Sequence, residues 1–209
     1  MSESFDSEEL FTIYTRTGVE ENLKRLILAI IADIGDLDVL IPYKILYRKA
    51  GKGKWRKRLL RFFDSYLFIR SGNPEKLFFD LKSVPKLSKL MHDGEFSFVP
   101  LEEQERNFVS LLCSVGVREI MHEQKGIDKL ILPVSQLDLI PAAEAGKGDI
   151  IIRRSSDEKV LKVISGPLLK LAPYVDKVDF HNRRVSLDIN WLGEHRLNVG
   201  FKLPQDAEV

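Results

Sequence analysis

The apolar pattern changes near residue 159, and this change constrains the fold more than any other feature of the sequence. Before it, segments with the two-residue period of strands alternate with segments that have the three- and four-residue period of helices. After it come four short runs with strand-like alternation, VLKVI, YVDKVDF, RRVSLDINW and HRLNVGF, which are separated by turn residues. The sequence therefore predicts an α+β protein whose last part is a small all-β barrel of four or five strands.

The first part of the chain predicts three helices set between strands. Thr17 and Glu20 have the spacing of a capping box, which predicts a helix whose apolar stripe runs to Ile34. Asn73 and Pro74 are typical of a second helix start. The remaining expected elements are strands at 11–14, 38–47, 65–70, 88–91 and 96–99 and a helix at 101–114.

Residues 115–158 leave two interpretations open. The runs ILPV, DLIP and DIIIRR could be short strands, whereas PAAEAGKG between them resembles a flexible connection. We expect a linker with an insertion at this point. The predicted order is a polar tail at 1–10, a first domain at 11–114, this linker, and the barrel at 159–205.

Positive charge is concentrated in one segment, although the formal net charge of the chain is only +1. Residues 44–61 contain nine Lys or Arg residues and no acid, and Gly51 and Gly53 within them favour a hairpin or loop arm. Such a run is often only a solvated loop. It could also neutralise phosphates, and Trp55 could stack on an unpaired base. The candidate nucleic-acid-binding residues are Arg16, Lys52, Lys54, Trp55, Arg56, Lys57 and Arg58.

Cysteine usage and hydropathy indicate a cytoplasmic, soluble protein. The single cysteine, Cys113, has no partner for an internal disulfide. The longest apolar stretch, Leu26–Ala32, is far shorter than the roughly 20 residues of a membrane-spanning helix. We therefore expect no membrane association.

Catalytic motifs are not evident in the sequence. Asp176, Asp179 and His181 have a ligand-like appearance, but no second cluster supplies further metal ligands. The sequence contains neither a GxSxG elbow nor a P-loop. We expect a protein that is not an enzyme and that needs no metal and no cofactor.

Several motifs resemble the NusG family of transcription factors. The segments FTIYTRTGVEE and KWRKRLLR leading into FFDSYLFI are similar to the amino-terminal domain of that family, and KVISGPLLKL followed by VDKVDFHNRRVSLDI is similar to its KOW barrel. TRTGVEE, PEKLFFDLKSVPKLSKLM and FSFVPLEEQERNF look most like the LoaP-type specialised paralogs, which are associated with processive antitermination. The resemblance implies a NusG-type α/β sandwich followed by a small KOW (SH3-like) barrel.

The resemblance also implies a function and a set of partners. The first domain would bind the clamp helices of the largest RNA polymerase subunit through Phe11, Phe63 and Tyr66, although strand aromatics also commonly fill cores. The nucleic acid would be an RNA hairpin or bubble DNA, and the KOW domain would recruit a ribosomal protein or a termination factor. The expected protein is a monomer that promotes processive elongation, with antitermination at selected operons. The residues that match the KOW motif are Gly166, Pro167, Asp179 and Arg183.

Two turns depart from the family pattern. The turn from Phe63 to Tyr66 has Asp64 and Ser65 where the family typically has proline and glycine. The KOW turn lacks its second glycine, which puts nucleic-acid contact there in doubt because glycine lets backbone approach a ligand closely. The alternative function is a stand-alone RNA-binding or ribosome-associated module that uses the basic arm and the barrel without polymerase.

Overall fold

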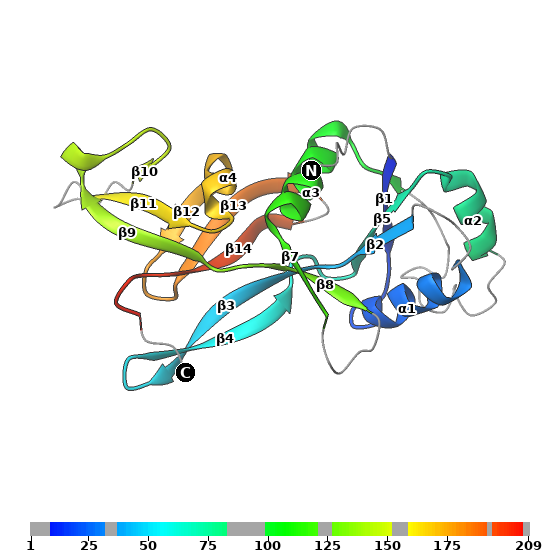
Figure 1. Ribbon diagram of the computed structural model, residues 1–209, viewed down its shortest axis with the longest axis horizontal. Helices are drawn as coiled ribbons and strands as arrows, with labels where there is room; N and C mark the ends of the chain where they lie inside the picture. The colour runs from blue at the N-terminus through cyan, green and yellow to red at the C-terminus, as the bar shows by residue number, and fades with distance from the viewer. Residues whose placement is uncertain are drawn as a thin grey trace. The chain divides into compact units, whose positions relative to one another are not determined.

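The computed structural model describes residues 9–31, 37–82, 99–120, 127–151, 159–191 and 194–206 (Figure 1). The chain divides into two compact units. Unit 1 comprises Met1–Pro42, Phe63–Ser110 and Arg118–Leu130. Unit 2 comprises Tyr43–Phe62, Leu111–Val117 and Ile131–Val209. Each unit is described separately below.

Unit 1 contains a four-stranded antiparallel sheet with the order β2-β5-β1-β6. Its strands are β1 (Glu9–Tyr14), β2 (Leu37–Leu40), β5 (Tyr66–Ser71) and β6 (Val99–Pro100). In the pairing of the central strands, Tyr14 lies opposite Tyr66. The strands predicted at 11–14 and 65–70 are confirmed. The predicted strand at 88–91 lies outside the described residues.

Helix α1 (Glu20–Ile30) contacts β2 and β5 of this sheet. Its apolar stripe is present because Leu23 and Ile27 are fully buried, but Ile30 is 41% exposed. The helix ends earlier than the predicted Ile34, and residues 32–36 are not among those described. The predicted capping box is wrong, since the N-cap is Val19 and no side chain caps the helix.

Helix α2 (Pro74–Lys82) begins at the predicted place. The Asn73 side-chain oxygen accepts a hydrogen bond from the Lys76 N–H at 3.1 Å, which is the expected N-cap bond. Leu77 and Leu81 on its inner face are fully buried. The predicted third helix is also confirmed as α3 (Glu103–Val115).

Unit 2 contains a six-stranded sheet with the order β10-β11-β9-β14-β13-β12. Its strands are β9 (Ser135–Pro141), β10 (Ile150–Ile151), β11 (Lys159–Ser165), β12 (Val175–Asp179), β13 (Arg184–Trp191) and β14 (Glu194–Lys202). Strand β14 pairs with β9 in parallel, and the other pairs are antiparallel. Fully buried Leu137, Leu161, Leu187 and Phe201 form part of its core.

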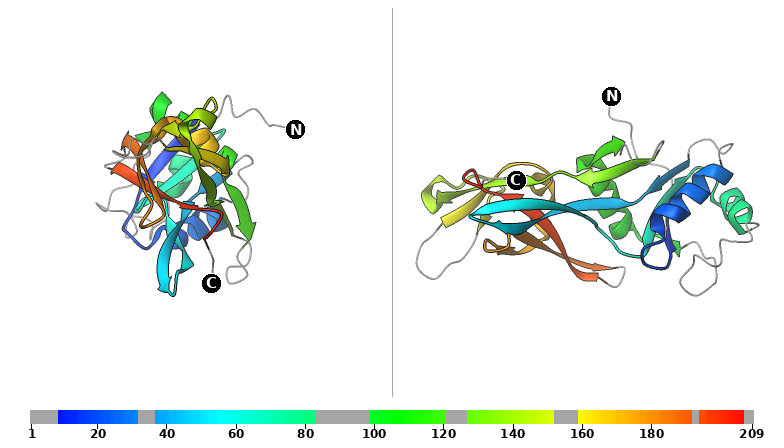
Figure 2. Two further views of the ribbon diagram at one scale, coloured as in Figure 1. Left: turned by 90° about the vertical axis from the view of Figure 1, so that its left-hand side faces the viewer. Right: turned by 90° about the horizontal axis from the view of Figure 1, so that it is seen from below.

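A third sheet has the order β4-β3-β8-β7, with β3 (Pro42–Gly51), β4 (Lys54–Arg61), β7 (Val117–Ile120) and β8 (Asp128–Leu132). Strands β3 and β4 form a hairpin, which is one of the two alternatives, hairpin or loop arm, that the sequence left open. In unit 2 this hairpin runs beside β14 (Figure 2). A Cβ placed on Gly200 of β14 would lie 2.3 Å from the Ile45 carbonyl oxygen, so this close approach requires glycine.

The prediction of a mixed α+β protein is confirmed. Among the alternatives left open for 115–158, strands are present there as β7, β8, β9 and β10, together with a 3₁₀ turn at Ala142–Glu144. Four strands lie within 159–205, as expected, but their sheet also includes β9 and β10. The KOW barrel and the domain boundaries at 114 and 159 stay predictions.

Candidate functional site: a tyrosine pair and a cationic hairpin

The turn before β5 has an unusual backbone conformation at Ser65. Its φ is +70°, in the left-handed region that favours glycine, and glycine is the residue that the NusG resemblance leads us to expect there. Three contacts stabilise this conformation. The Ser65 N–H donates to the Glu20 Oε1 at 2.9 Å, the Ser65 carbonyl accepts from the Thr15 N–H at 2.8 Å, and the Ser65 and Thr17 hydroxyls lie 2.6 Å apart.

These contacts explain the failure of the predicted capping box. Thr17 and Glu20, whose spacing suggested reciprocal bonds at the start of α1, both bond to Ser65 instead. The Glu20 side chain is buried, with 0% exposure, so a buried carboxylate supports the turn. These hydrogen bonds connect the start of α1 to the start of β5.

Tyr66 follows this turn and stacks on Tyr14 of β1, with ring centroids 5.0 Å apart. Tyr14 is 39% exposed and Tyr66 is half-buried, so the pair offers aromatic surface to a partner. Sequence reasoning selected Tyr66 and missed Tyr14. The two residues meet through the register of β1 and β5, which the sequence does not reveal.

Phe11 and Phe63, the other predicted polymerase-binding residues, are buried. Their exposed fractions are 7% and 1%. The Phe63 ring packs edge-to-face on Phe68 at 5.4 Å. Both side chains therefore fill the core, which is the alternative that the sequence left open. Direct contact with a partner would require them to become exposed.

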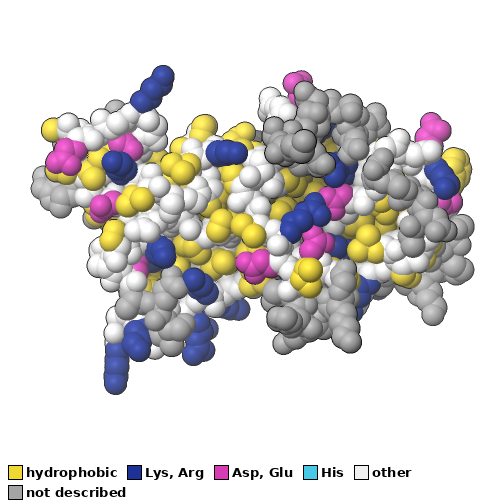
Figure 3. Space-filling view, viewed as in Figure 1, with side chains coloured by type: hydrophobic (Ala, Val, Ile, Leu, Met, Phe, Trp, Pro, Cys, Tyr) yellow, Lys and Arg dark blue, Asp and Glu magenta, His cyan; other side chains and the backbone are white. Residues whose placement is uncertain are grey.

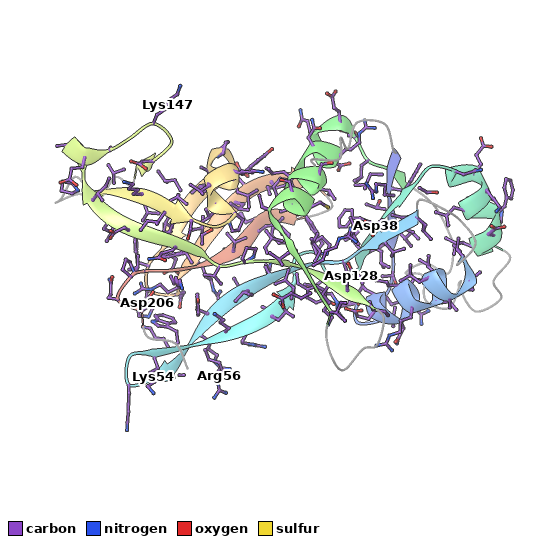
Figure 4. The ribbon with its side chains drawn as sticks, viewed as in Figure 1. Asp38, Lys54, Arg56, Asp128, Lys147 and Asp206 are labelled. Atoms are coloured by element: carbon purple, nitrogen blue, oxygen red, sulfur yellow. The ribbon has the colours of Figure 1, made fainter. Side chains whose placement is uncertain are left out.

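The β3–β4 hairpin presents the predicted cations to solvent. Lys52, Lys54, Arg56, Lys57 and Arg58 are all exposed. Because strand side chains alternate, Lys54, Arg56 and Arg58 lie on one face of β4. Figure 4 shows Lys54 and Arg56 pointing away from the hairpin, and dark-blue Lys and Arg side chains gather over this region at the lower left of Figure 3.

Arg48 of β3 adds a further cation to this face. It lies directly opposite Arg56 in the hairpin register. Within the part of the chain that the structure describes, Arg48, Lys54, Arg56 and Arg58 form no ion pair with an acidic side chain. We call these four residues the cationic face. Sequence reasoning overlooked Arg48 because the strand pairing that brings it beside Arg56 was not known.

Trp55 lies on the other face of β4 and is only 7% exposed. Its ring packs edge-to-face with Tyr47 at 6.4 Å. The Lys49 Nζ and the Arg183 guanidinium lie 5.8 Å and 5.2 Å from the ring centroid. The predicted stacking of Trp55 on an unpaired base would require this ring to be uncovered.

Arg16 is exposed in the connection between β1 and α1. Its carbonyl accepts a bond from the Val19 N–H at 3.3 Å, and its side chain is open to solvent. Arg16 belongs to unit 1, whereas the cationic face belongs to unit 2.

The residues matched to the KOW motif occupy two turns of unit 2. Gly166 has a φ of +92° and precedes the short helix α4 (Leu168–Leu171), whose Leu168 N–H donates to the Ser135 hydroxyl at 3.0 Å. Pro167 is the N-cap of α4. This short helix lies where the NusG resemblance implies a glycine-containing turn.

Asp179 and Arg183 belong to the turn between β12 and β13. The Asp179 carboxylate accepts bonds from the Asn182 N–H at 3.0 Å and the Asn182 side-chain amide at 2.7 Å. The side-chain bond from Asn182 is the main reason that the pKa of Asp179 lies below its ordinary value. His181 lies 3.2 Å from the Lys49 Nζ through its Nε2. Asp176 instead pairs with Arg196 at 3.5 Å.

Arg183 and Asp206 form a paired set of hydrogen bonds. The Arg183 Nε and Nη2 each lie 2.7 Å from a different oxygen of Asp206. Burial alone would raise the pKa of Asp206, but the bonds from Arg183 and from the Leu203 N–H outweigh it, and the pKa lies below its ordinary value. The side chains are 15% and 6% exposed, so this pair lies largely out of water.

Among the described residues, no group of three His, Cys, Asp or Glu side chains is placed to hold a metal ion. No helix in the described part of the chain combines the length and the hydropathy needed to cross a membrane.

Comparison with known proteins gives two findings. Residues 8–109 match the model of the family described as transcription termination factor nusG. A solved structure titled "Domain interaction in Thermotoga maritima NusG" matches with a TM-score of 0.40 and 15% sequence identity, and the match covers 93% of each chain. Among curated proteins, none matches this chain.

Proposed function

From the match of residues 8–109 to the NusG family model, we propose that this chain is a transcription elongation factor that binds RNA polymerase through these residues. The family match is the observation that carries the proposal, because NusG-family factors bind RNA polymerase. The factor performs no bond-breaking chemistry of its own. It alters elongation by adding binding free energy to one state of the polymerase.

The proposed polymerase-binding surface is centred on Tyr66 and its stacking partner Tyr14. Tyrosine suits such a surface because it buries a large area and has few rotatable bonds. Phe63 supports this surface from within, since it packs on Phe68, which lies on the same face of β5 as Tyr66. The proposed target is the pair of clamp helices of the largest polymerase subunit. Phe11 stays a weaker proposal because its ring is buried.

The test is retention of RNA polymerase by the purified chain. Tyr14→Ser combined with Tyr66→Ser should weaken polymerase binding by at least about 30-fold, because the loss of a single hot-spot anchor costs about 2 kcal/mol or more and such losses are not additive. Phe79→Ser is the matched control, since Phe79 is 68% exposed on α2 and is not part of the proposed surface. Equal polymerase retention by wild type and the double variant would refute the proposed surface.

We also propose that the cationic face binds nucleic acid close to the polymerase, either an RNA hairpin or bubble DNA. The exposure of Lys54, Arg56 and Arg58 on one face, without acidic partners among the described residues, supports this part of the proposal. Lys52, Lys57 and Arg16 are further candidate phosphate contacts. Trp55 could stack on a base only if its ring becomes uncovered.

Salt dependence tests this second part. Affinity should fall steeply between about 50 and 200 mM salt because each phosphate contact releases counterions. Arg56→Gln should reduce the slope of log affinity against log salt by about 0.9 for a duplex probe, the value for one lost phosphate contact. Glu75→Gln on α2 is the control, because it leaves the cationic face intact. An unchanged slope in Arg56→Gln would remove Arg56 from the contact set.

The finer form of the proposal is processive antitermination at selected operons, as in the LoaP-type paralogs. Transcription through a terminator, with and without an upstream leader, tests it. Read-through that depends on the leader supports operon-specific antitermination. Equal read-through on both templates supports a general elongation factor instead.

The alternative function is a stand-alone RNA-binding or ribosome-associated module. The exposed cationic face favours this alternative as well. If wild-type chain retains no polymerase but binds RNA with a steep salt dependence, the alternative replaces the polymerase proposal. Recruitment of a ribosomal protein or termination factor by residues 159–205 stays a proposal, as does the monomeric state.

A further inference from the structure

The Arg183 side chain connects the β12–β13 turn to the hairpin. Its guanidinium lies 5.2 Å from the centroid of the Trp55 ring and 5.9 Å from that of Phe201. Asp206 holds it with two bonds of 2.7 Å, and its Nη1 donates to the Phe180 carbonyl. One side chain therefore contacts the hairpin, β14 and the segment after β14 within unit 2.

The chemistry of this contact suits arginine and not lysine. A planar guanidinium can lie against an aromatic ring while it donates two parallel bonds to one carboxylate. A lysine ammonium is a point charge on a flexible stem and cannot do both. Arg183 also has a φ of +53°, a conformation that a residue of this kind rarely adopts without support from its surroundings.

Trp55 lies on the face of β4 opposite to the cationic face. It is flanked in β4 by Lys54 and Arg56, whose side chains project to the opposite face because strand side chains alternate. When Arg183 holds the indole inward, the neighbouring cations are directed outward. The close approach of Gly200 to the Ile45 carbonyl allows the hairpin to lie near β14.

We propose that Arg183 is a positioning residue for nucleic-acid binding, which acts through Trp55 to orient the cationic face. Arg183 itself contacts no phosphate. This inference rests on the proposed binding of nucleic acid by the hairpin. It assigns to Arg183, which lies in the β12–β13 turn, a role in a site that lies on the hairpin.

Fluorescence makes the contact measurable, because the chain has only two tryptophans. In a Trp191→Phe background, Trp55 is the single reporter. Arg183→Lys should shift the Trp55 emission to longer wavelength, because the indole becomes exposed to water. The matched control is Arg184→Lys, since Arg184 is the next residue and its side chain is exposed.

Binding to a labelled RNA hairpin and to a labelled DNA bubble completes the test. Arg183→Lys should weaken binding about fivefold or more, the low end of typical coupling between two sites. The slope of log affinity against log salt should stay at the wild-type value, because no phosphate contact is lost. Arg184→Lys should change neither the emission nor the affinity.

Three results with Arg183→Lys would overturn the inference. The first is an unchanged Trp55 emission in Arg183→Lys. The second is an emission shift without loss of affinity. The third is an affinity loss with a slope smaller by about 0.9 on the RNA hairpin or the DNA bubble, which would make Arg183 a phosphate contact. If wild type binds neither probe, the proposed hairpin function fails together with this inference, whereas polymerase retention is measured independently.

A second variant tests the inference independently, in case Arg183→Lys misfolds. Asp206→Asn keeps Trp55 and Arg183 but removes the carboxylate that holds the guanidinium. It should give the same emission shift and the same loss of affinity at an unchanged salt slope. Far-UV circular dichroism of both variants should match wild type, and wild-type behaviour of a folded Asp206→Asn would also overturn the inference.

Discussion

Gly166→Ala should destabilise unit 2 for two physical reasons that can be measured separately. The φ of Gly166 is +92°, and a left-handed conformation costs a residue with a Cβ about 1–2 kcal/mol. A Cβ at this position would also lie 2.6 Å from the Ser135 Cα and 2.8 Å from its hydroxyl oxygen. Overpacking of this kind typically costs about 1–3 kcal/mol. Together the two effects predict a loss of about 2–5 kcal/mol in the free energy of unfolding.

Gly148→Ala separates the backbone effect from the steric one. The φ of Gly148 is +101°, but no atom lies within 4 Å of the Cβ that would be added. This control should lose only about 1–2 kcal/mol.

Urea unfolding followed by tryptophan fluorescence is the suitable assay, because both tryptophans belong to unit 2. The midpoint should fall further in Gly166→Ala than in Gly148→Ala. Equal losses in the two variants would refute the steric argument, since they would show that Ser135 moves aside at no cost.

Two further predictions concern the same unit. Asp206→Asn should lower the free energy of unfolding at pH 7 by about 1.5–3 kcal/mol, the usual worth of hydrogen bonds to a charged group. Because the folded-state pKa of Asp206 is depressed, its contribution is present above the unfolded pKa and is lost as the pH falls through the folded pKa. The difference between wild type and variant should therefore shrink as the pH falls below about 4, and a difference that persists in acid would contradict this account. On β9, Leu137→Ala should lower the free energy of unfolding by about 2–5 kcal/mol because Leu137 is fully buried. Leu139→Ala, at a position 37% exposed, should lower it far less. Similar urea midpoints for the two variants would show that β9 is not a core strand.

Local patterns predicted the elements whose defining contacts are local. Asn73 caps α2 through an amide three residues away, and the glycines at 51 and 53 mark a hairpin turn with positive φ values. These contacts involve neighbours in the sequence, so the residue types alone indicate them. The hairpin and the start of α2 were therefore predictable.

At other positions, residues far away in the sequence gave side chains different contacts from those predicted. Thr17 and Glu20 have the spacing of a capping box, yet Ser65 competes for both side chains and binds them. Trp55 is surrounded by cations in the sequence, which suggested a ring open to a base. It is buried instead, and Arg183, far along the chain, is among the side chains that lie against its ring. A single sequence does not identify such partners. The sequence therefore predicted which charged residues belong to the candidate site, but not how they are arranged in space.

The parallel pairing of β9 with β14 has a consequence for folding during synthesis. Strands β9, β10 and β11 can pair among themselves, as can β12, β13 and β14, because each group is contiguous in the chain. Among the described residues, strand pairing joins the two groups where Phe201 lies opposite Ser135 and Lys202 opposite Gln136. On the ribosome, the start of β9 therefore lacks this pairing until Lys202 has emerged. During this interval the unpaired part of β9 is open to pairing with another strand, and a chaperone could protect it.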